Sequence, residues 1–333
     1  MRNFSGLFQG LLLAVGILMG ETVHAKVWRV NNTPGVSANF ADFNLAVTAA
    51  ATGDTIYLEG SSNAYSGQVT KPLVVIGPGY FLSGPSANPG LQANTLPATI
   101  SLNIDSTASG SQFIGLTGSF NPSGGADNVT IMRCLINSLS TFSSGNFSDW
   151  KVRQCYFNGG SLAIYSATTN WQITNCIFFG TGFDLSAGTN LLFRNNTLYA
   201  VNVRANGAYI ANNIFSGNCG VADALNSTIR YNLASRNILP PGNSNQNNIP
   251  ESSLTLGTSN ADNQYQQPAG SPALGAGEPI NGITPDAGAF GTATPYRLSG
   301  IPPIPTIYSL TVPSSIPTTA TTITISFSTR SNN

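Results

Sequence analysis

The sequence has very little charge. Only 8% of its 333 residues are charged, and 13 basic residues balance 13 acidic residues, so the formal net charge is zero. Binding to nucleic acid needs clustered Lys and Arg that displace counterions from phosphates, and disordered chains combine low hydrophobicity with high net charge. The composition argues against both classes. Hydrophobic residues make up 41% of the chain, which is enough for a large core.

Histidine is nearly absent. The single histidine, His24, lies in a segment with the features of an export signal. Residues 1–25 contain Arg2, then an apolar run over 11–19, then the small-residue pattern V-H-A that signal peptidase accepts. The run is too short for a comfortable membrane span. We therefore expect an exported protein, either secreted, at the cell surface or in the periplasm. It would begin at Lys26 and lack histidine for acid–base, nucleophilic or metal chemistry.

A phrase of about twenty residues recurs along the middle of the chain. It reads NVTIMRCLIN at 128–137, DWKVRQCYFNG at 149–159, NWQITNCIFFG at 170–180 and NLLFRNNTLYA at 190–200. Self-similarity at this period is typical of a solenoid. The phrases align on one column of residues, which we call the ladder column: Cys134, Cys155, Cys176, Asn196, Asn213 and Asn232.

Each repeat carries the strand period of two on both sides of the ladder column, with a shift of one residue between the sides. The shift predicts two short strands joined by a tight bend. Asn tolerates the left-handed backbone that such bends need. Two columns consist mostly of Asn. The column that heads each phrase contains Asn128, Asp149, Asn170, Asn190 and Asn226. The column just before the ladder column contains Gln154, Asn175, Asn195 and Asn212.

Stacking such repeats places ladder-column residues above one another in the core, about 4.8 Å apart as in any parallel sheet. Three thiols stacked in one direction cannot all form disulfides. We expect free, buried cysteines that behave as small hydrophobic residues, continued by an asparagine ladder. Trp150 and Trp171 fall in an inward column, so we interpret them as core residues and not as a sugar platform.

At the front of the chain, NFADFNLAVTAAATGDTIYLEG combines an amphipathic helix with a following strand, and SPALGAG (271–277) and DAGAFG (286–291) resemble a closing phrase of exported β-helix proteins. With the repeats, these segments resemble the right-handed parallel β-helix proteins of the pectate-lyase-like superfamily. The resemblance implies an all-β, single-stranded right-handed parallel β-helix over 26–291 with an N-terminal capping helix, clearest over 128–235. Residues 292–333 are then a Pro-rich linker and a C-terminal strand segment.

The superfamily contains lyases, hydrolases, esterases and adhesins, so the resemblance leaves the function open. Its hydrolases use a paired Asp-Asp and a Gly-His-Gly, and the mature chain has neither. Its lyases hold calcium with several carboxylates, and no three acids fall on one predicted face. No cofactor or metal is therefore expected, with calcium reserved for the lyase alternative. An atypical polysaccharide lyase or glycoside hydrolase would use Arg153 or Arg194 with Asp149 or Asp184.

The leading hypothesis is a non-catalytic protein that presents a rigid surface for glycan binding, adhesion or an envelope role. Arg153, Arg194 and Arg230 occupy one outward column in alternate repeats, about 10 Å apart, and could pair with an acidic polysaccharide. A second outward column is mostly apolar, so we expect the C-terminal tail or a partner to cover it. It consists of Leu135, Tyr156, Ile177, Thr197, Ile214 and Leu233.

Overall fold

The bends predicted from the repeat have left-handed backbone in the computed structural model, which describes residues 25–84, 88, 90–141, 145–257 and 261–332. In the heading column, φ is 53° at Asn128 and 60° at Asp149. In the column before the ladder, φ is 55° at both Arg133 and Gln154 and 59° at Asn212. Two bends per repeat let successive turns stack in register. Residues 1–24, which hold nearly all of the expected export signal, lie outside the described residues.

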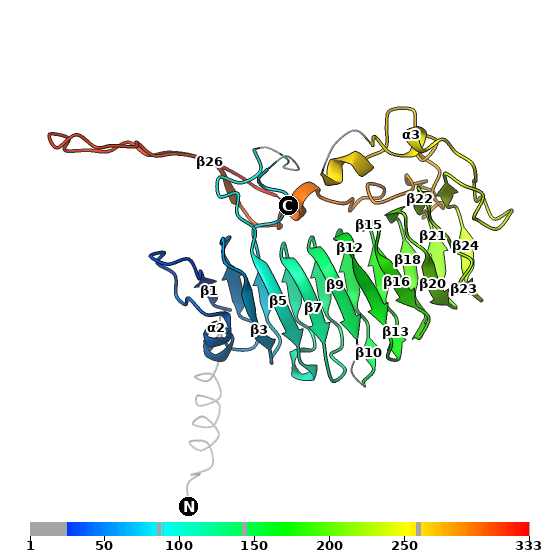
Figure 1. The fold of residues 1–333 in the computed structure, drawn as a ribbon, viewed down its shortest axis with the longest axis horizontal. Coiled ribbons are helices and arrows are strands. Elements are labelled where there is room, and N and C mark those ends of the chain that lie inside the picture. Colours follow the sequence, from blue (N-terminus) through cyan, green and yellow to red (C-terminus); the bar gives the residue numbers. More distant parts are fainter. Residues whose placement is uncertain (1–24, 85–87, 89, 142–144, 258–260, 333) are drawn as a thin grey trace, which may run out of the picture.

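The chain forms the predicted all-β parallel solenoid, with about nine turns (Figure 1). One sheet has ten described strands in sequential order, each parallel to its neighbours. Its strands are β1 (Val27–Val30), β2 (Thr55–Leu58), β4 (Val74–Ile76), β6 (Gln112–Ile114), β8 (Thr130–Met132), β11 (Lys151–Arg153), β14 (Gln172–Thr174), β18 (Leu192–Arg194), β21 (Tyr209–Ala211) and β24 (Thr228–Arg230).

A second parallel sheet begins after the bend that contains the ladder column. Its path is β3 (Tyr65–Val69), β5 (Thr99–Ile104), β7 (Thr117–Pro122), β9 (Leu135–Thr141), β12 (Tyr156–Ile164), β15 (Ile177–Phe179), β19 (Thr197–Tyr199), β22 (Ile214–Ser216) and β25 (Leu233–Ala234). Three strands branch from β12 in the same sheet, namely β16 (Gly182–Leu185), β20 (Val203–Asn206) and β23 (Ala224–Leu225).

Short elements complete the fold. A three-stranded sheet is made of β10 (Phe147–Ser148), β13 (Thr168–Thr169) and β17 (Gly188–Thr189). The helical segments are α2 (Phe43–Ala49), α3 (Glu251–Leu254), η1 (Ser106–Ala108), η2 (Asp262–Tyr265) and η3 (Leu298–Gly300). Within the described residues, no helix is long and apolar enough to cross a membrane. Helix α2 lies where the sequence predicts one and buries Phe43, Ala46 and Val47. That it caps the solenoid stays a prediction.

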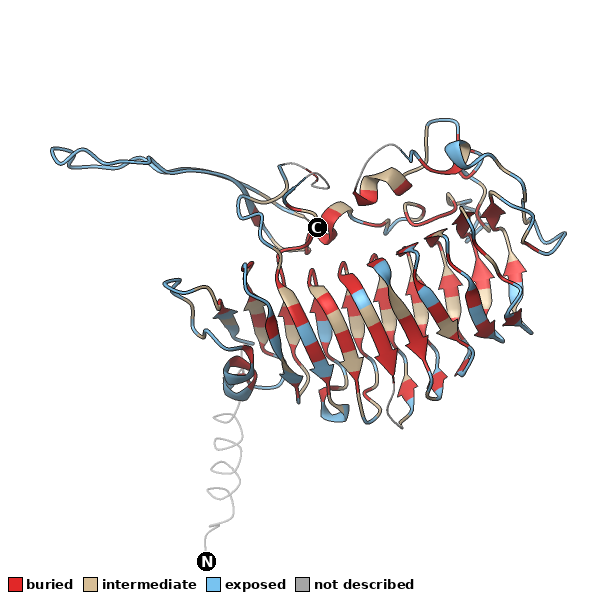
Figure 2. Ribbon diagram, viewed as in Figure 1, coloured by how far each residue is buried: buried red, intermediate tan, exposed pale blue. Residues whose placement is uncertain are grey.

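Aromatic and sulfur-containing side chains stack in the core as the repeat predicts. The rings of Trp150 and Trp171 are parallel within 3°, with centroids 4.9 Å apart, and both side chains are buried. Phe157 and Phe178 stack at 4.4 Å. All four cysteines are free and buried. Figure 2 shows the buried residues running along the inside of the stack, so that one continuous core connects the turns.

The chain then returns along the outside of the solenoid. We call residues 262–301 the strap; in Figure 1 it is the gold-to-orange segment that runs beside the upper ends of the strands. It buries the apolar outward column under Tyr265, Ala273, Ala287, Ala289 and Tyr296. Leu135 keeps 7% of its surface exposed and Ile177 none. The expected cover therefore exists, but much of it comes from residues before 292, within the range assigned above to the β-helix.

The column before the ladder fixes the path of the strap. Gln154 Nε2 donates to the carbonyl oxygens of Thr294 and Pro295, and Asn175 Nδ2 donates to those of Ala289 and Gly291. Further along, Asn195 Nδ2 donates to the carbonyl oxygen of Asp286, and Asn212 Oδ1 accepts from Glu278 N. The bend residues therefore serve two purposes, because they turn the chain and also bind the strap backbone.

Beyond the strap the chain ends in an antiparallel hairpin of β26 (Thr306–Thr311) and β27 (Ser326–Arg330). It projects away from the solenoid (Figure 1). Its large apolar side chains are exposed: Ile307, Tyr308, Leu310, Val312, Ile316, Ile323, Ile325 and Phe327. The base of the hairpin returns to the solenoid, and this return completes the site described next.

Candidate anion-binding site

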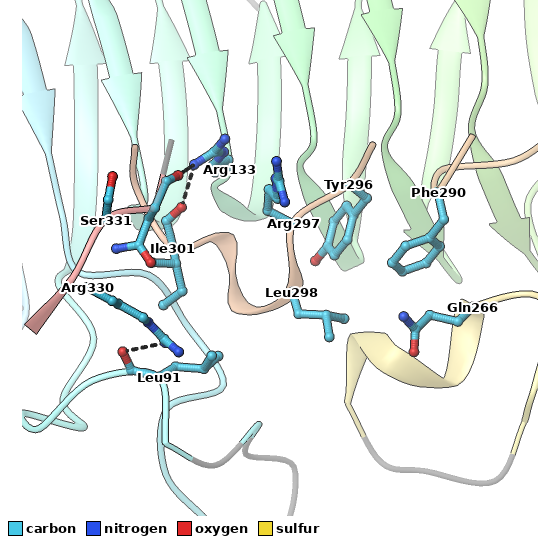
Figure 3. Close-up of a pocket in the computed structure, with 11 residues that line it drawn as sticks. Leu91, Arg133, Gln266, Phe290, Tyr296, Arg297, Leu298, Ile301, Arg330 and Ser331 are labelled. Carbon is cyan, nitrogen blue, oxygen red and sulfur yellow. Dashed lines mark hydrogen bonds between the residues drawn. The ribbon is translucent and has the colours of Figure 1, made fainter. Parts of the chain in front are cut away.

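A pocket of about 380 Å³ lies where the solenoid, the strap and the base of the hairpin meet (Figure 3). Arg133 enters it from the bend after β8, Arg297 and Leu298 from the strap, and Arg330 from the end of β27. We call it the arginine pocket. Its lining residues are Leu91, Arg133, Gln266, Phe290, Tyr296, Arg297, Leu298, Ile301, Arg330, Ser331 and Asn332.

Arg133 is the most firmly held of these side chains. It is 7% exposed. Its Nε donates to Gln154 Oε1 at 2.9 Å, and its Nη1 donates to the carbonyl oxygens of Ile301 at 2.8 Å and Asn332 at 3.5 Å. These bonds fix the guanidinium at the pocket wall (Figure 3). A cation that is positioned before binding loses little side-chain entropy when a ligand arrives.

Two further arginines bring positive charge to the same pocket. Arg330 Nη2 donates to the carbonyl oxygen of Leu91 at 2.9 Å, while its buried Nε has no hydrogen-bond partner among the described residues. Arg297 is exposed at the rim. None of the eleven described lining residues carries a carboxylate. The described lining of the pocket thus holds three cations and no anionic side chain.

The electrostatic consequence is visible at Arg133. Burial, and then the neighbouring charge of Arg297, lower the pKa of Arg133 to about 10. The guanidinium stays protonated at neutral pH, but its charged form is disfavoured. A bound anion would relieve both causes, because it would replace lost solvation and offset the repulsion between the two cations.

Aromatic residues close one side of the pocket. Phe290 and Tyr296 meet edge to face with centroids 5.4 Å apart. Behind them, Tyr296 Oη donates to Asp262 Oδ2 at 2.8 Å, and the same carboxylate accepts from Asn88 Nδ2 and from Ser299 N. Burial raises the pKa of Asp262. The Asp262 carboxylate therefore bonds to Tyr296, Asn88 and Ser299, and among the described residues no hydrogen bond or ion pair joins it to an arginine of the pocket.

The arginines proposed from the sequence lie in register in the first sheet, in alternate strands as predicted. Arg153 Nη2 donates to Gln172 Oε1 at 3.2 Å. Arg194 and Arg230 converge on one carboxylate, Glu278 of the strap, each with a closest contact of 3.4 Å. Their role in binding an external glycan stays a prediction.

The two candidate aspartates have other partners. Asp149 Oδ1 accepts from Asn170 Nδ2 at a bend, and Asp184 pairs with Arg204 at 3.1 Å in the second sheet. Among the described residues, no hydrogen bond or ion pair joins either aspartate to Arg153 or Arg194. The described part of the chain also holds no group of three His, Cys, Asp or Glu side chains placed to bind a metal ion.

The ladder column is part of the core. Asn213 Oδ1 accepts from Asn196 N at 2.8 Å, and Asn232 Oδ1 accepts from Asn213 N at 2.9 Å. In the sulfur part of the column, Cys155 N donates to Cys176 Sγ at 3.4 Å. Each side chain therefore satisfies a backbone N–H of the preceding turn, which is a structural role.

Comparison with known proteins adds little to this picture. No family model matches the chain, and no curated protein matches it significantly. One solved structure with some similarity is QnrB1, described as a plasmid-mediated fluoroquinolone resistance protein. It has 11% sequence identity and a TM-score of 0.22, and the match covers 55% of this chain and 81% of that chain. A similarity at that level carries no argument about the present protein.

Sequence reasoning missed the arginine pocket. Arg133 gave a signal that could have been read, because it stands in a bend column otherwise filled by Gln or Asn in the next four repeats. Arg297 and Arg330 gave none, since they lie outside the repeat. Their places in the pocket depend on the path of the strap, for Arg297, and of the hairpin beyond it, for Arg330.

Proposed function

We propose that this protein is an exported, non-catalytic binding protein that captures an anionic group of an acidic polysaccharide in the arginine pocket. The observation that carries the proposal is that Arg133, Arg297 and Arg330 all line one cavity whose described lining has no carboxylate. The export part rests on the sequence of residues 1–25.

The chemistry of the lining favours a uronate carboxylate. A guanidinium forms paired, parallel hydrogen bonds with a planar carboxylate, and such charge-assisted bonds are stronger than neutral ones. The volume of about 380 Å³ falls within the range of ~300–1,000 Å³ typical of small-molecule pockets. Phe290 and Tyr296 add an aromatic wall beside the charges. A sugar carrying one carboxylate suits this combination of cationic and apolar surface.

The solenoid supports this function mechanically. Arg133 stands on a bend whose backbone is fixed by the stack, and the strap is tied down by a row of Gln and Asn side chains. A rigid site binds with little cost of ordering. The non-catalytic part of the proposal is supported by the separate engagements of Asp149 and Asp184, each of which bonds to its own neighbours.

The test is calorimetric titration of the purified protein with oligogalacturonate and with a neutral oligosaccharide of equal length. Arg297→Ala and Arg330→Ala should each weaken uronate binding about tenfold, which corresponds to ~1.4 kcal/mol. Arg236→Ala is the matched control, because this exposed arginine bonds to Asn218 away from the pocket. Affinity should also fall as salt is raised.

Three results would contradict the proposal. Equal affinity for the neutral and acidic oligosaccharides would remove the role of charge. Tight binding of inorganic phosphate without uronate binding would point to a small anion as the ligand. A rise in ultraviolet absorbance from unsaturated products, or a gain of reducing ends, would establish the lyase or hydrolase alternative instead.

A further inference from the structure

Glu278 is held by three donors of the first sheet. Tyr209 Oη lies 2.8 Å from Glu278 Oε1 and 2.6 Å from Oε2. Arg194 Nη2 lies 3.4 Å from Oε2, and Arg230 Nε lies 3.4 Å from Oε1. The strands β18, β21 and β24 that carry these donors are consecutive, and Tyr209 lies on the middle strand, two residues before the position in register with Arg194 and Arg230. This is the donor set that an external carboxylate would need.

The charge at this site is not balanced by Glu278. Two guanidinium groups share one carboxylate, and both contacts are longer than the 2.7–2.9 Å of strong charge-assisted bonds. The buried Nε of Arg194 has no hydrogen-bond partner among the described residues, and the buried Nε of Arg230 has only its 3.4 Å ion pair with Glu278, which is not a hydrogen bond. All three side chains keep partial solvent access, between 18% and 38%. A partly exposed pair of this kind contributes ~0–1 kcal/mol, so replacing it costs little.

Glu278 stands on a small loop with few ties to the solenoid. Residues 277–285 close on themselves through Gly277 N to the Pro285 carbonyl and through mutual bonds between Ile280 and Ile283. Ile283 is 72% exposed. Apart from its carboxylate, Glu278 is bound to the solenoid by two backbone contacts: its N–H donates to Asn212 Oδ1 at 2.7 Å, and its carbonyl oxygen accepts from Arg194 Nη2 at 3.4 Å. The loop could lift while the rest of the strap remains bound.

We propose that Arg194, Arg230 and Tyr209 form a second carboxylate-binding site, which Glu278 occupies in the free protein and from which a carboxylate-bearing ligand displaces it. The site selects a carboxylate because its donors already bind one. For the glycan class of the ligand, the inference rests on the proposed function. A polyuronate offers many carboxylates along one chain, so it could engage this site and the arginine pocket together.

The first experiment isolates the site from the arginine pocket. Arg297→Ala and Arg330→Ala are introduced together, and Glu278→Ala is added to empty the second site. Sodium acetate should then raise the melting temperature of the triple variant more than sodium chloride of equal ionic strength. The protein that retains Glu278 should show a smaller acetate effect. Adding Arg194→Ala should abolish the difference. Glu278→Gln serves as a second, isosteric variant if the alanine variant folds poorly.

An equal response to acetate and chloride in both Glu278 variants would overturn the inference. Because the arginine pocket is already disabled, this outcome would not bear on the proposed function. Conversely, if oligogalacturonate does not bind the natural protein, the proposed function fails, but the acetate experiment still tests whether Arg194, Arg230 and Tyr209 bind a carboxylate.

The second experiment tests displacement with Glu278 in place. Ile283→Cys introduces an exposed thiol, whereas the four natural cysteines are buried. An environment-sensitive fluorophore at this position should change its emission as oligogalacturonate saturates the protein, and Arg194→Ala should reduce the change at least fivefold. No change at saturating oligogalacturonate would contradict displacement. A change of equal size in the Arg194→Ala variant would show that the loop responds to binding elsewhere.

Discussion

Asn213→Ala is expected to destabilise the protein more than any exposed asparagine substitution. The Asn213 side chain is fully buried and makes four hydrogen bonds. Its Oδ1 accepts from Asn196 N at 2.8 Å and from Asn196 Nδ2 at 3.1 Å. Its Nδ2 donates to the Phe193 carbonyl oxygen at 3.0 Å and to Asn232 Oδ1 at 2.9 Å. Alanine would remove all four bonds.

The magnitude follows from the partners left behind. Asn196 N–H loses its acceptor in a buried place, which costs ~1–3 kcal/mol, and the other partners lose part of their bonding at ~0.5–1 kcal/mol each. The expected loss is about 3–5 kcal/mol, a large share of the ~5–15 kcal/mol that usually stabilises a domain. Asn213→Cys should cost roughly half as much, because Cys176 already accepts a backbone N–H in the same column.

Urea unfolding followed by tryptophan fluorescence measures this loss, since Trp150 and Trp171 stack in the same core. Asn237→Ala is the control: Asn237 is exposed, so its replacement should change stability by less than ~0.5 kcal/mol. The reasoning is refuted if Asn213→Ala unfolds within 1 kcal/mol of the natural protein, or if the cysteine variant is as unstable as the alanine variant.

Three further outcomes are expected. Burial and the Glu278 carboxylate raise the pKa of Tyr209, so Glu278→Gln should lower it in a carbon-13 NMR titration; an unchanged value would contradict the contact. The stabilising effect of this raised pKa is present below pH ~10 and is lost as pH rises through the raised value. All four thiols are buried, so they should resist a disulfide reagent at pH 8 until urea is added; at Cys219 burial also raises the pKa to about 11, and rapid reaction of the folded protein would be inconsistent with buried thiols. Gly118→Ala should cost more than ~2 kcal/mol by denaturation, because φ is 149° and a Cβ would overlap the Ile100 carbonyl oxygen; wild-type stability would show that the backbone adapts.

The repeat could be predicted because its signals are local. The ladder-column cysteines, the inward Trp150 and Trp171, and the left-handed bends at Asn128 and Asp149 each follow from spacing within about twenty residues. A parallel stack converts that spacing directly into neighbours in space. The resemblance to the pectate-lyase-like superfamily also implied an all-β parallel solenoid, and this part of what it implied is confirmed. No comparison extends it to a family or an activity.

The site could not be predicted, because it depends on segments that have no period. The apolar column containing Leu135 indicated that something covers it, but residues 262–301 gave no sign of their path. Arg194 was expected to bind an external acid, which stays a prediction; that Glu278 of the strap lies against it had no local signal in the sequence. Arg330 lies in the same pocket as Arg133 because the hairpin beyond the strap folds back to the solenoid. Such long-range placement is set by tertiary packing and not by local pattern.

The most direct test of the account is NMR observation of arginine side-chain N–H groups during titration with oligogalacturonate. The account predicts that the signals of Arg133, Arg297 and Arg330 shift together with one binding constant, because all three line the cavity that the ligand would occupy. Arg236, which bonds to Asn218 elsewhere, should stay unchanged. Saturating oligogalacturonate that leaves the three pocket signals in place would contradict the proposed function.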